Sequence, residues 1–490
     1  MNEQSRNMTT VPNLPENRGL YYGGAWHEPA GGYTSVTSPA TGADLGQVAE
    51  ANQSDVAAAA EAAHQAFQSW RWLKPSVRGD ALRQVAEILR QNREELALID
   101  AIDCGNPVKA LMRDVDIAAE LTEYFAGLVY ETRGATIPMG DGIVNMTIRE
   151  PYGVCARIVA YNHPIMFIAS RFAAPVAAGN TVIMKPPPQA PLSALRFAEL
   201  IDGVFPPGVF NVLTGGKECG EALVAHPLIP KITLIGSIPT GRAISRGASD
   251  RLKDVSLELG GKNALVVYPD ADLDRAAAGA VKGMAFTWCG QACSSTTRLF
   301  LHEDIHDAVL DRVAESVKAF RPGIPTDPET TMGAIVSKEQ YDKILSYIEI
   351  GKSEGARLVA GGKRPDDPQL ADGWYIEPTV FAEVTADMRI AQEEIFGPVL
   401  SVLKWRDEDE MFAQVNAVEY GLAGGVFTRD LATAHRAISR IEAGYTWVNN
   451  AAAHFFPAPF GGTKQSGNNR EECFEELLSF TQVKNVYIDL

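Results

Sequence analysis

The stretch VCARIVAYNHPIMFIASRFAAPVAAGNTVIMK, residues 154–185, decides the fold class. It opens with a short apolar run over 154–161, continues as a helical segment that Gly179 ends, and closes with a second apolar run over 180–185. Strands that are apolar on both faces and separated by a helix are typical of a parallel sheet covered on both sides. The stretch therefore predicts a βαβ unit with a right-handed crossover.

The same alternation continues on both sides of this stretch. A helix is expected after Pro191, and further apolar strands over 209–215 and 231–236. Upstream, Ser54 is a candidate N-cap for a helix reaching Trp70, and a second helix is expected over roughly 78–99. The pattern predicts a doubly wound parallel sheet with the N-terminal helices packed on it.

A second series of strands follows the segment LELGGKN (257–263). Its strand candidates are ALVVY, TRLFLH, ARLVAGG, PVLSVLKW, GGVFTR and GYTWVNN, with helical segments between them. This predicts another α/β unit of roughly 180 residues, a usual domain size. Gly260 and Gly261 lie where a hinge between the two units is expected.

Two segments fit neither unit. IVNMTIRE (143–150) alternates apolar and polar side chains, and QVKNVYIDL (482–490) is a β-rich run that closes the chain. Exposed strands tend to pair with another chain, so we expect a homo-oligomer. A hairpin that lies on its own domain is the alternative, and the pattern alone does not separate the two.

Composition excludes several classes of protein. The chain has 44 Lys and Arg against 61 Asp and Glu, a net charge of −17, which repels nucleic acid and anionic membranes. No stretch approaches the roughly 18–20 apolar residues of a membrane span. The opening MNEQSRNMTT is polar and unlike a secretory signal, so we expect a cytoplasmic protein. The six cysteines are scattered, which predicts neither a disulfide framework nor a metal site.

Two segments hold candidate reactive groups. In WCGQACSSTTR (288–298), small residues surround Cys293, and the segment is expected to be a loop that enters a helix, whose free N–H groups would favour a thiolate. The alternative is a small buried hydrophobe. Glu258, between apolar residues and two glycines, is either a general base with a raised pKa or a paired structural carboxylate.

Two glycine-rich turns are candidate phosphate-binding sites. TGGKECG (214–220) and IGSIPTGR (235–242) each follow an expected strand and open a helix, where backbone N–H groups can hold a pyrophosphate. Each turn alone is a weak signal. Two such turns in consecutive βα units favour a nucleotide-binding protein.

Eight segments together resemble the aldehyde dehydrogenase superfamily, in its non-acylating, NAD(P)⁺-dependent branch. They are YNHP, GNTVIMKP, PPGVFNVLTGG, IGSIPTGR, LELGGKN, GQAC, EEIFGPV and PFGGTKQSGNNRE, in the family's order and approximate spacing from about Leu20 to the C-terminus. The resemblance implies an α/β fold with a Rossmann-like cofactor domain, an α/β catalytic domain and a β-hairpin oligomerisation arm. The implied limits are 1–130 and 151–260 for the cofactor domain, 261–471 for the catalytic domain, and 131–150 and 472–490 for the oligomerisation strands.

The resemblance also implies the catalytic residues. Cys293 would attack the aldehyde carbon, Asn162 would hold the oxyanion, and Glu258 would activate the water that hydrolyses the thioester. Glu471 matches a residue that passes protons away from the base, with Arg171 near the inner end of that path. A surface ion pair is the alternative for these last two residues.

The implied cofactor is NAD⁺ or NADP⁺. The matching residues are Tyr161, Lys185, Pro188, Gly216, Gly220, Gly236, Ser237, Leu259, Glu394 and Phe396. Pro188 stands where members that prefer NAD⁺ carry a glutamate, whose carboxylate holds the ribose hydroxyls and repels a 2′-phosphate. We therefore expect NADP⁺ to be tolerated, and the preference is left open.

The implied substrate tunnel is mostly aromatic. Its residues are Phe167, Ser170, Trp288, His454, Phe455, Phe456 and Phe460. This favours a neutral apolar or aromatic small-molecule aldehyde as substrate. One alternative is a catabolic semialdehyde dehydrogenase, with Arg171 or His454 holding a charged distal group, and another is a non-catalytic binding protein on the same scaffold. The family's members form dimers and tetramers, and the resemblance implies a homodimer or homotetramer here.

Cys289, four residues before Cys293, admits two interpretations. One is inert packing, and the other is a disulfide with Cys293 that would inactivate the enzyme reversibly. The four-residue spacing does not ensure suitable geometry for a disulfide.

Overall fold

The computed structural model describes residues 12–489. The polar opening MNEQSRNMTT, on which the expectation of no secretory signal rests, lies outside the described residues. Within 12–489, no helix is both long and apolar enough to cross a membrane.

The first large sheet has seven strands in the order β11-β10-β7-β8-β9-β1-β2. Its strands are β1 (Leu20–Tyr22), β2 (Ala25–His27), β7 (Val154–Ile158), β8 (Thr181–Lys185), β9 (Phe210–Val212), β10 (Lys231–Ile235) and β11 (Asp254–Glu258). The five strands from β7 to β11 run parallel, and β1 and β2 add antiparallel strands at one edge. The predicted βαβ unit over 154–185 and the strands over 209–215 and 231–236 are confirmed.

Both faces of this sheet are buried, which explains its continuous apolar strands. Along β7, Val154, Ala156 and Ile158 pack into one core cluster, whereas Cys155 packs into the cluster on the opposite face. The second cluster also takes in the helices of residues 75–127. The N-terminal helices therefore pack on the first sheet, as the sequence predicted.

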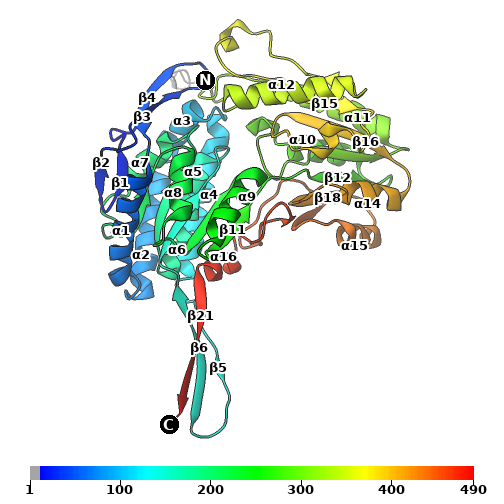
Figure 1. Cartoon of the computed structure of the whole chain (residues 1–490). Coiled ribbons are helices and arrows are strands. Elements are labelled where there is room, and N and C mark those ends of the chain that lie inside the picture. The colour runs from blue at the N-terminus through cyan, green and yellow to red at the C-terminus, as the bar shows by residue number, and fades with distance from the viewer. Residues whose placement is uncertain (1–11, 490) are drawn as a thin grey trace, which may run out of the picture.

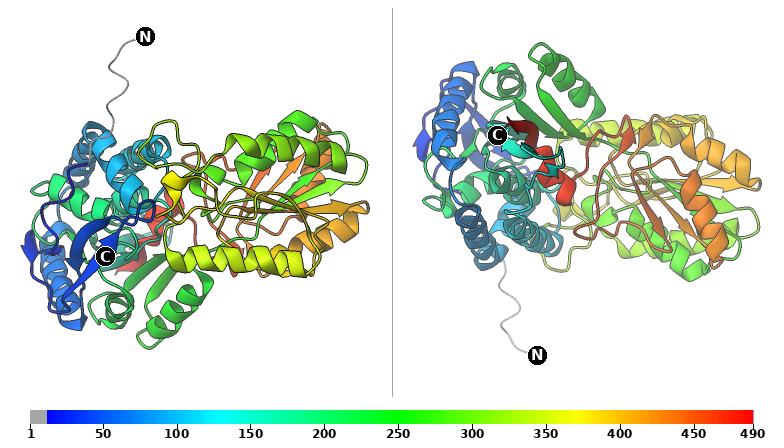
Figure 2. Two further views of the ribbon diagram at one scale, coloured as in Figure 1. Left: turned by 90° about the horizontal axis from the view of Figure 1, so that it is seen from above. Right: turned by 90° about the horizontal axis from the view of Figure 1, so that it is seen from below.

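The second large sheet has the order β14-β15-β16-β13-β12-β18-β19. Its strands are β12 (Ala264–Val267), β13 (Arg298–His302), β14 (Arg357–Ala360), β15 (Thr379–Ala382), β16 (Val399–Trp405), β18 (Ala423–Phe427) and β19 (Tyr445–Val448). All neighbours are parallel except β14 and β15. Figure 2 shows this sheet in a lobe beside the first one. The sheets divide between residues 258 and 264, and the domain limits given above stay a prediction.

The two segments that fitted neither unit pair with each other. β6 (Ile143–Pro151) and β21 (Thr481–Asp489) are antiparallel over nine residue pairs, and the short β5 (Thr136–Ile137) extends the sheet on the other side of β6. This ribbon projects from the body of the molecule (Figure 1). Val483 and Tyr487 on β21 are 59% and 53% exposed. Two more small sheets pair β3 (Tyr33–Thr37) with β4 (Asp44–Ala49), and β17 (Tyr420–Gly421) with β20 (Thr463–Lys464).

The helices lie between the strands and in an N-terminal group. They are α1 (Gln53–Trp70), α2 (Pro75–Gln91), α3 (Arg93–Asp103), α4 (Val108–Gly127), α5 (Pro164–Arg171), α6 (Ala173–Ala178), α7 (Leu192–Leu200), α8 (Lys217–Ala225), α9 (Ile238–Ser249), α10 (Leu273–Gly283), α11 (His306–Ser316), α12 (Lys338–Ser353), α13 (Arg389–Gln392), α14 (Glu408–Asn416), α15 (Leu431–Arg440) and α16 (Phe474–Ser479). Short 3₁₀ helices are η2 (Phe286–Trp288), η3 (Val317–Ala319) and η4 (Pro368–Leu370).

Three local expectations about helices are wrong. Asn52, not Ser54, caps α1, because its side chain accepts from the N–H groups of Ser54 and Asp55, and the Asp55 carboxylate accepts from Asn52 in a capping box. The helix expected over 78–99 is two helices, α2 and α3, divided at Asn92. The helix expected to run unbroken to Gly179 is interrupted at Phe172, although Gly179 does end α6, in the left-handed conformation that glycine adopts without strain.

Candidate active site

A cavity of about 210 Å³ lies where the order of the first sheet reverses. From β7 the chain crosses to β8 and β9 on one side and later to β10 and β11 on the other, so the carboxyl ends of β7 and β10 frame a crevice. Its lining residues are Ala160, Tyr161, Asn162, Ile235, Gly236, Ser237, Glu258, Gly260, Cys293, Gln340, Lys343, Glu394 and Phe396. Three of the four predicted catalytic residues, Asn162, Glu258 and Cys293, therefore lie in one cavity.

The Cys293 segment differs from the expectation of a loop that enters a helix. Cys293 lies in a turn that continues extended into β13, so its own segment provides no helix N-terminus for the sulfur. Asn263 fixes the turn by donating to the carbonyl oxygens of Cys293 (2.8 Å) and Ser295 (2.9 Å). Gly261 is required beside it, since an added Cβ would lie 2.6 Å from the Cys293 oxygen. The two glycines of LELGGKN thus permit a close backbone approach.

Burial and the neighbouring carboxylate keep Cys293 a thiol in the free protein. Burial and then the charge of Glu258 raise the pKa of the Cys293 thiol well above its usual value. The two side chains line the same cavity. Such a thiol needs a base before it can act as a nucleophile, and Glu258 is a carboxylate in the same cavity that can take the proton.

Glu258, at the end of β11, has the properties of a general base. Burial, and then the charge of Glu471, raise the pKa of Glu258 to about 8, against smaller opposing effects of Cys293 and Arg171. Its Oε1 atom is buried without a hydrogen-bond partner within the described part of the chain. A carboxyl group with a pKa near 8 can both accept and release a proton at neutral pH. The alternative of a carboxylate paired for structure alone is not favoured.

Asn162 lies between β7 and α5 and is held from behind by the α3–α4 hairpin. Asn106 donates to the Asn162 carbonyl oxygen at 2.9 Å, and the Asp100 carboxylate accepts from the Ile165 N–H at 2.8 Å. The Asn162 side-chain oxygen is buried without a partner among the described residues. This oxygen can accept a hydrogen bond from a ligand in the cavity, and the amide nitrogen beside it is the group that could donate one. The sequence offered no signal for Asn106 or Asp100, since their contacts are more than 50 residues away.

The cofactor side of the cavity holds five predicted residues. Ser237 caps α9 through a hydrogen bond with the Thr240 N–H, and Gly236 precedes it. Tyr161 and Phe396 meet edge to face, with ring centroids 5.8 Å apart. Glu394 accepts from the Gly261 N–H at 2.9 Å.

A dinucleotide fits these surroundings. The N-terminus of the twelve-residue α9 can hold a pyrophosphate, and an added Cβ on Gly260 would lie 2.1 Å from a Glu394 oxygen, so this wall needs a glycine. Two lining residues, Gln340 and Lys343 on α12, were missed from the sequence because they lie in a helix far from the recognisable segments.

The remaining predicted cofactor residues lie outside the cavity lining. The Gly216 N–H at the start of α8 donates to the Glu50 carboxylate at 2.9 Å. Because a carboxylate of the protein occupies this turn, the turn at Ser237 is the better candidate for binding a pyrophosphate. Lys185 is buried with its Cε 4.0 Å from a Cβ added on Gly220, and burial lowers the pKa of Lys185. Pro188 is exposed. Leu259 is buried against α9.

The fourth predicted catalytic residue, Glu471, belongs to a buried network of charges. Arg157 on β7 donates to Glu471 at 2.7 Å and to Glu476 at 2.9 Å, and Arg171 contacts Glu471 at 3.2 Å and Glu472 at 2.8 Å. All five side chains are at most 9% exposed. The surface ion pair considered for Glu471 and Arg171 is therefore wrong. Arg157, inside the apolar run VCARIVAY, was missed from the sequence.

The contacts within this network shift the pKa values of its carboxyl groups and of Arg171. Burial raises the pKa of Glu471 against the opposing charges of Arg171 and Arg157. Burial alone would also raise the pKa of Glu472, but His454 and Arg171 hold it at about 2. Burial alone would lower the pKa of Arg171, but Glu471, Glu472 and Glu476 raise it. Arg171 is thus committed to carboxylates of the protein.

Removing Arg157 is expected to destabilise the fold strongly. In Arg157→Ala, two buried carboxylates lose their partner, which costs about 3–5 kcal/mol in free energy of unfolding. Urea unfolding followed by tryptophan fluorescence at fixed protein concentration measures the loss. Arg113→Ala is the control, because the Arg113–Glu120 pair is 56% and 45% exposed and contributes less than about 1 kcal/mol. Equal losses in the two variants would contradict the stabilising role.

The predicted substrate residues form two aromatic groups. Phe167 on α5 lies under the Arg171 guanidinium, and His454 lies against Phe460 at a centroid distance of 4.5 Å. The Ser170 hydroxyl is buried and donates to the Met166 carbonyl. Phe455 is 65% exposed. Trp288 and Phe456 are partly buried, and the assignment of all seven residues to one tunnel stays a prediction.

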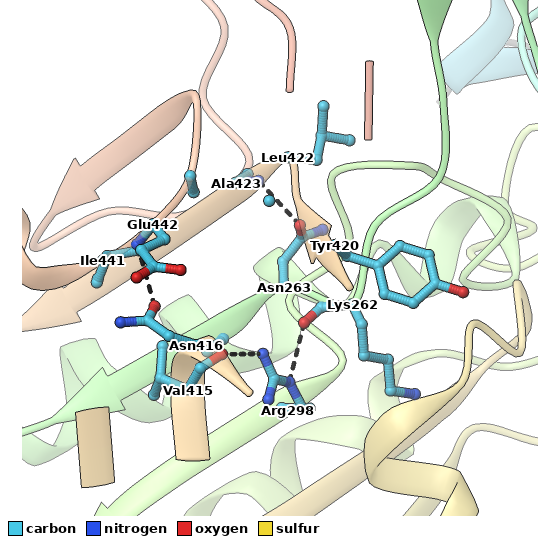
Figure 3. A pocket seen from close by; sticks show the side chains of 13 residues that line it. Lys262, Asn263, Arg298, Val415, Asn416, Tyr420, Leu422, Ala423, Ile441 and Glu442 are labelled. Atoms are coloured by element: carbon cyan, nitrogen blue, oxygen red, sulfur yellow. Dashed lines mark hydrogen bonds between the residues drawn. The ribbon is translucent and has the colours of Figure 1, made fainter. Parts of the chain in front are cut away.

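A second, much smaller hollow lies behind Lys262 and Arg298 (Figure 3). Arg298 donates to the carbonyl oxygens of Lys262, Gln414 and Val415 at 2.8–3.1 Å, so its guanidinium joins loops. The hollow measures about 10 Å³, room for one water at most. It is not a candidate substrate site.

Cys289 is fully buried in the core of the second sheet. Burial raises the pKa of its thiol to about 12, so it stays protonated at neutral pH. This favours packing, and the disulfide with Cys293 stays a hypothesis. Within residues 12–489, no group of three or more His, Cys, Asp or Glu side chains is arranged to hold a metal ion.

The chain is similar to known proteins over most of its length. The family model described as "Aldehyde dehydrogenase family" matches residues 26–486. An aldehyde dehydrogenase named tropH from Talaromyces stipitatus is 50% identical over 485 residues, covering 97% of this chain and 94% of that protein. A betaine aldehyde dehydrogenase from Brucella anthropi is 42% identical over 473 residues, covering 96% and 97%. The solved NAD⁺ complex of an aldehyde dehydrogenase from Bacillus cereus superposes with a TM-score of 0.94 at 37% identity, covering 97% of each chain.

Proposed function

The chain belongs to the aldehyde dehydrogenase family and is an oxidoreductase, and from that premise we propose that it converts an aldehyde to a carboxylic acid through a thioester on Cys293. One observation carries the proposal: the thiol of Cys293, the carboxyl group of Glu258 and the amide of Asn162 line the same cavity. Enzymes of this family use NAD⁺ or NADP⁺. The bound dinucleotide supplies the acceptor for the hydride that leaves the substrate carbon.

The chain's own residues carry the other steps. The Cys293 proton moves to Glu258 as the sulfur bonds to the aldehyde carbon, and the Asn162 amide donates to the oxygen that becomes negative. After hydride loss, the carbon is held to Cys293 as a thioester. Glu258 then takes a proton from water, the water oxygen bonds to the thioester carbon, and the C–S bond breaks to release the acid and the thiol.

Glu258 has to release its first proton before it can activate water. Glu471 is close enough for its charge to raise the pKa of Glu258. Arg157 donates hydrogen bonds to both Glu471 and Glu476, so it joins these two carboxylates. We propose this buried row of carboxylates as the proton path. A raised pKa at both Glu258 and Glu471 brings the two groups closer in proton affinity, which eases transfer between them.

The proposed substrate is a neutral apolar or aromatic aldehyde. Aromatic side chains form most of the predicted tunnel, and Arg171, the arginine considered for a substrate carboxylate, is paired with Glu471 and Glu472. This disfavours the alternative of a semialdehyde dehydrogenase in which Arg171 holds the charged distal group of the substrate. The test is dinucleotide reduction with benzaldehyde, hexanal, betaine aldehyde and succinic semialdehyde. If succinic semialdehyde gave the highest kcat/KM, the proposed substrate class would be contradicted. If no aldehyde of a broad panel led to reduction of the dinucleotide, the proposed aldehyde oxidation itself would be wrong.

The cofactor preference is proposed to be weak. The wild-type enzyme should use NAD⁺ over NADP⁺ by no more than about a thousandfold in kcat/KM, roughly 4 kcal/mol. Pro188→Glu should raise that ratio at least tenfold, since a charged hydrogen bond contributes about 1.5–3 kcal/mol and the carboxylate repels a 2′-phosphate. Gln189→Glu, at the neighbouring exposed position, is the control and should change the ratio less than about threefold. Equal effects of both substitutions would contradict a specific ribose contact.

The proposed assembly is a homodimer or homotetramer formed through the β6–β21 ribbon. The ribbon projects from the body and exposes Val144, Ile148, Val483 and Tyr487, the kind of strand surface that pairs with another copy. Sedimentation that detects only monomer at micromolar concentration would count against it. The cytoplasmic location expected from the sequence stays a prediction.

A further inference from the structure

His163 lies next to the predicted oxyanion amide and has no role in the steps above. It is the residue before α5, and its side chain is 17% exposed. Its Nδ1 atom lies 2.7 Å from an oxygen of Asp114 on α4, whose side chain is 2% exposed. A buried carboxylate that contacts one ring nitrogen orients the ring and leaves Nε2 for another partner.

The contact with Asp114 decides what Nε2 can do. An ionised carboxylate only accepts hydrogen bonds, so the Nδ1 atom carries a proton and donates. In the neutral ring Nε2 is then an acceptor, and in the charged ring it is a donor. A hydroxyl group both donates and accepts, so it pairs with Nε2 in either state, whereas a methyl group pairs in neither.

The surroundings of His163 are those of the predicted substrate tunnel. Its ring meets Phe167 edge to face at 5.6 Å and lies 5.4 Å from the ring of Trp288. Both neighbours were predicted from the sequence to line the tunnel. The indole Nε1 of Trp288 is buried with no hydrogen-bond partner among the described residues, a donor that a ligand oxygen would satisfy. The aromatic wall therefore contains two neighbouring rings that each carry a polar nitrogen atom.

We propose that His163, oriented by Asp114, selects aldehydes that carry a hydroxyl group on an aromatic or alicyclic ring. The ring packs against Phe167 and Trp288, and the hydroxyl group pairs with Nε2 of His163. This specificity rests on the proposed function and narrows its substrate class. A carboxylate would pair only with the charged imidazole, and an ammonium group only with the neutral one, so the hydroxyl group is the partner that fits both states.

Matched pairs of substrates isolate the hydroxyl contact. The 2-, 3- and 4-hydroxybenzaldehydes are each compared with the methyl isomer of the same shape. Wild-type enzyme is expected to favour the hydroxyl compound at least tenfold in kcat/KM for one ring position, and His163→Phe to bring that hydroxyl-to-methyl ratio close to one. His163→Gln, whose amide donates and accepts, should restore part of the preference. His435→Phe, an exposed histidine on α15, is the control and should leave the ratios unchanged.

Binding to a variant without the nucleophile separates this inference from the proposed function. Dissociation constants of the same pairs are measured calorimetrically with Cys293→Ser and with Cys293→Ser plus His163→Phe. A hydroxyl preference that disappears with His163 supports the inference even if wild-type protein oxidises no aldehyde. Equal hydroxyl-to-methyl ratios with and without His163, in binding or in kcat/KM, overturn it. If His163→Phe does not fold, the ratio of Asp114→Asn, which loses the carboxylate that orients His163, decides in the same way.

Discussion

Cys293→Ala is expected to abolish aldehyde oxidation, lowering kcat by about 10⁴-fold or more, while NAD⁺ still binds. The thiol forms the only covalent link to substrate in the proposed reaction, and an alanine cannot hold the carbon for hydride transfer or hydrolysis. Turnover is measured by absorbance of the reduced dinucleotide, and binding of NAD⁺ by calorimetry. Retained NAD⁺ affinity would show that the cavity is intact and that only the chemistry is lost.

Cys289→Ala is the matched control for this loss. Cys289 is buried four residues away and packs in the core of the second sheet, so its removal should cost stability and leave kcat within about threefold. The same variant tests the disulfide hypothesis. If peroxide inactivation and its recovery with thiols are unchanged in Cys289→Ala, Cys289 does not trap Cys293. Substantial oxidation by Cys293→Ala would contradict the proposed nucleophile.

Glu258→Gln is expected to stop the reaction after the first half. The glutamine cannot accept a proton from water, so steady-state turnover should fall about 10²–10⁴-fold, the usual contribution of a general base. Thioester formation should be slowed less than hydrolysis, because the substitution also removes the carboxylate charge that raises the pKa of the Cys293 thiol. The thioester should therefore accumulate on Cys293. Rapid-mixing absorbance measures the first turnover, and mass spectrometry of quenched enzyme measures the acyl group on the Cys293 peptide. A bare Cys293 under these conditions would remove the proposal.

The pH dependence of hydrolysis checks the same group. Burial raises the pKa of Glu258 to about 8, so the active, ionised form is the minor one at pH 6 and the major one at pH 9. The hydrolysis rate of wild-type enzyme should therefore rise with pH, with its midpoint near pH 8, and level off above about pH 9. Glu410→Gln, at an exposed carboxylate on α14, should retain this profile, and Glu258→Gln should lose it.

Much of the fold followed from the sequence because its signals are local. In the run over 154–161, the residues that face the two cores are apolar, with the exception of Arg157. A run of this kind predicts a strand that is covered on both faces. Gly179 was correctly predicted to end a helix because it adopts a conformation that other residues resist. Helix limits were less predictable: Asn52 replaced Ser54 as the cap because the Asp55 carboxylate completes the box with Asn52.

The site was predictable in its residue types and not in its electrostatics. The segments YNHP, LELGGKN and GQAC indicated Asn162, Glu258 and Cys293, and the structure brings them to one cavity. The expected helix after Cys293 is absent, and the shift of its pKa is opposite in sign to the prediction, because burial and the charge of Glu258 act on it.

By itself, the sequence determined the alternation of strands and helices, the membership of the family and the candidates for the reacting groups, since each depends on residues close together in the chain. Only the tertiary structure decided which charges meet. Arg157 and Glu471 are separated by 314 positions, and His163 and Asp114 by 49. Their pairing sets the protonation of Glu258 and the orientation of His163, because removal from water makes a charge depend on the few groups packed against it.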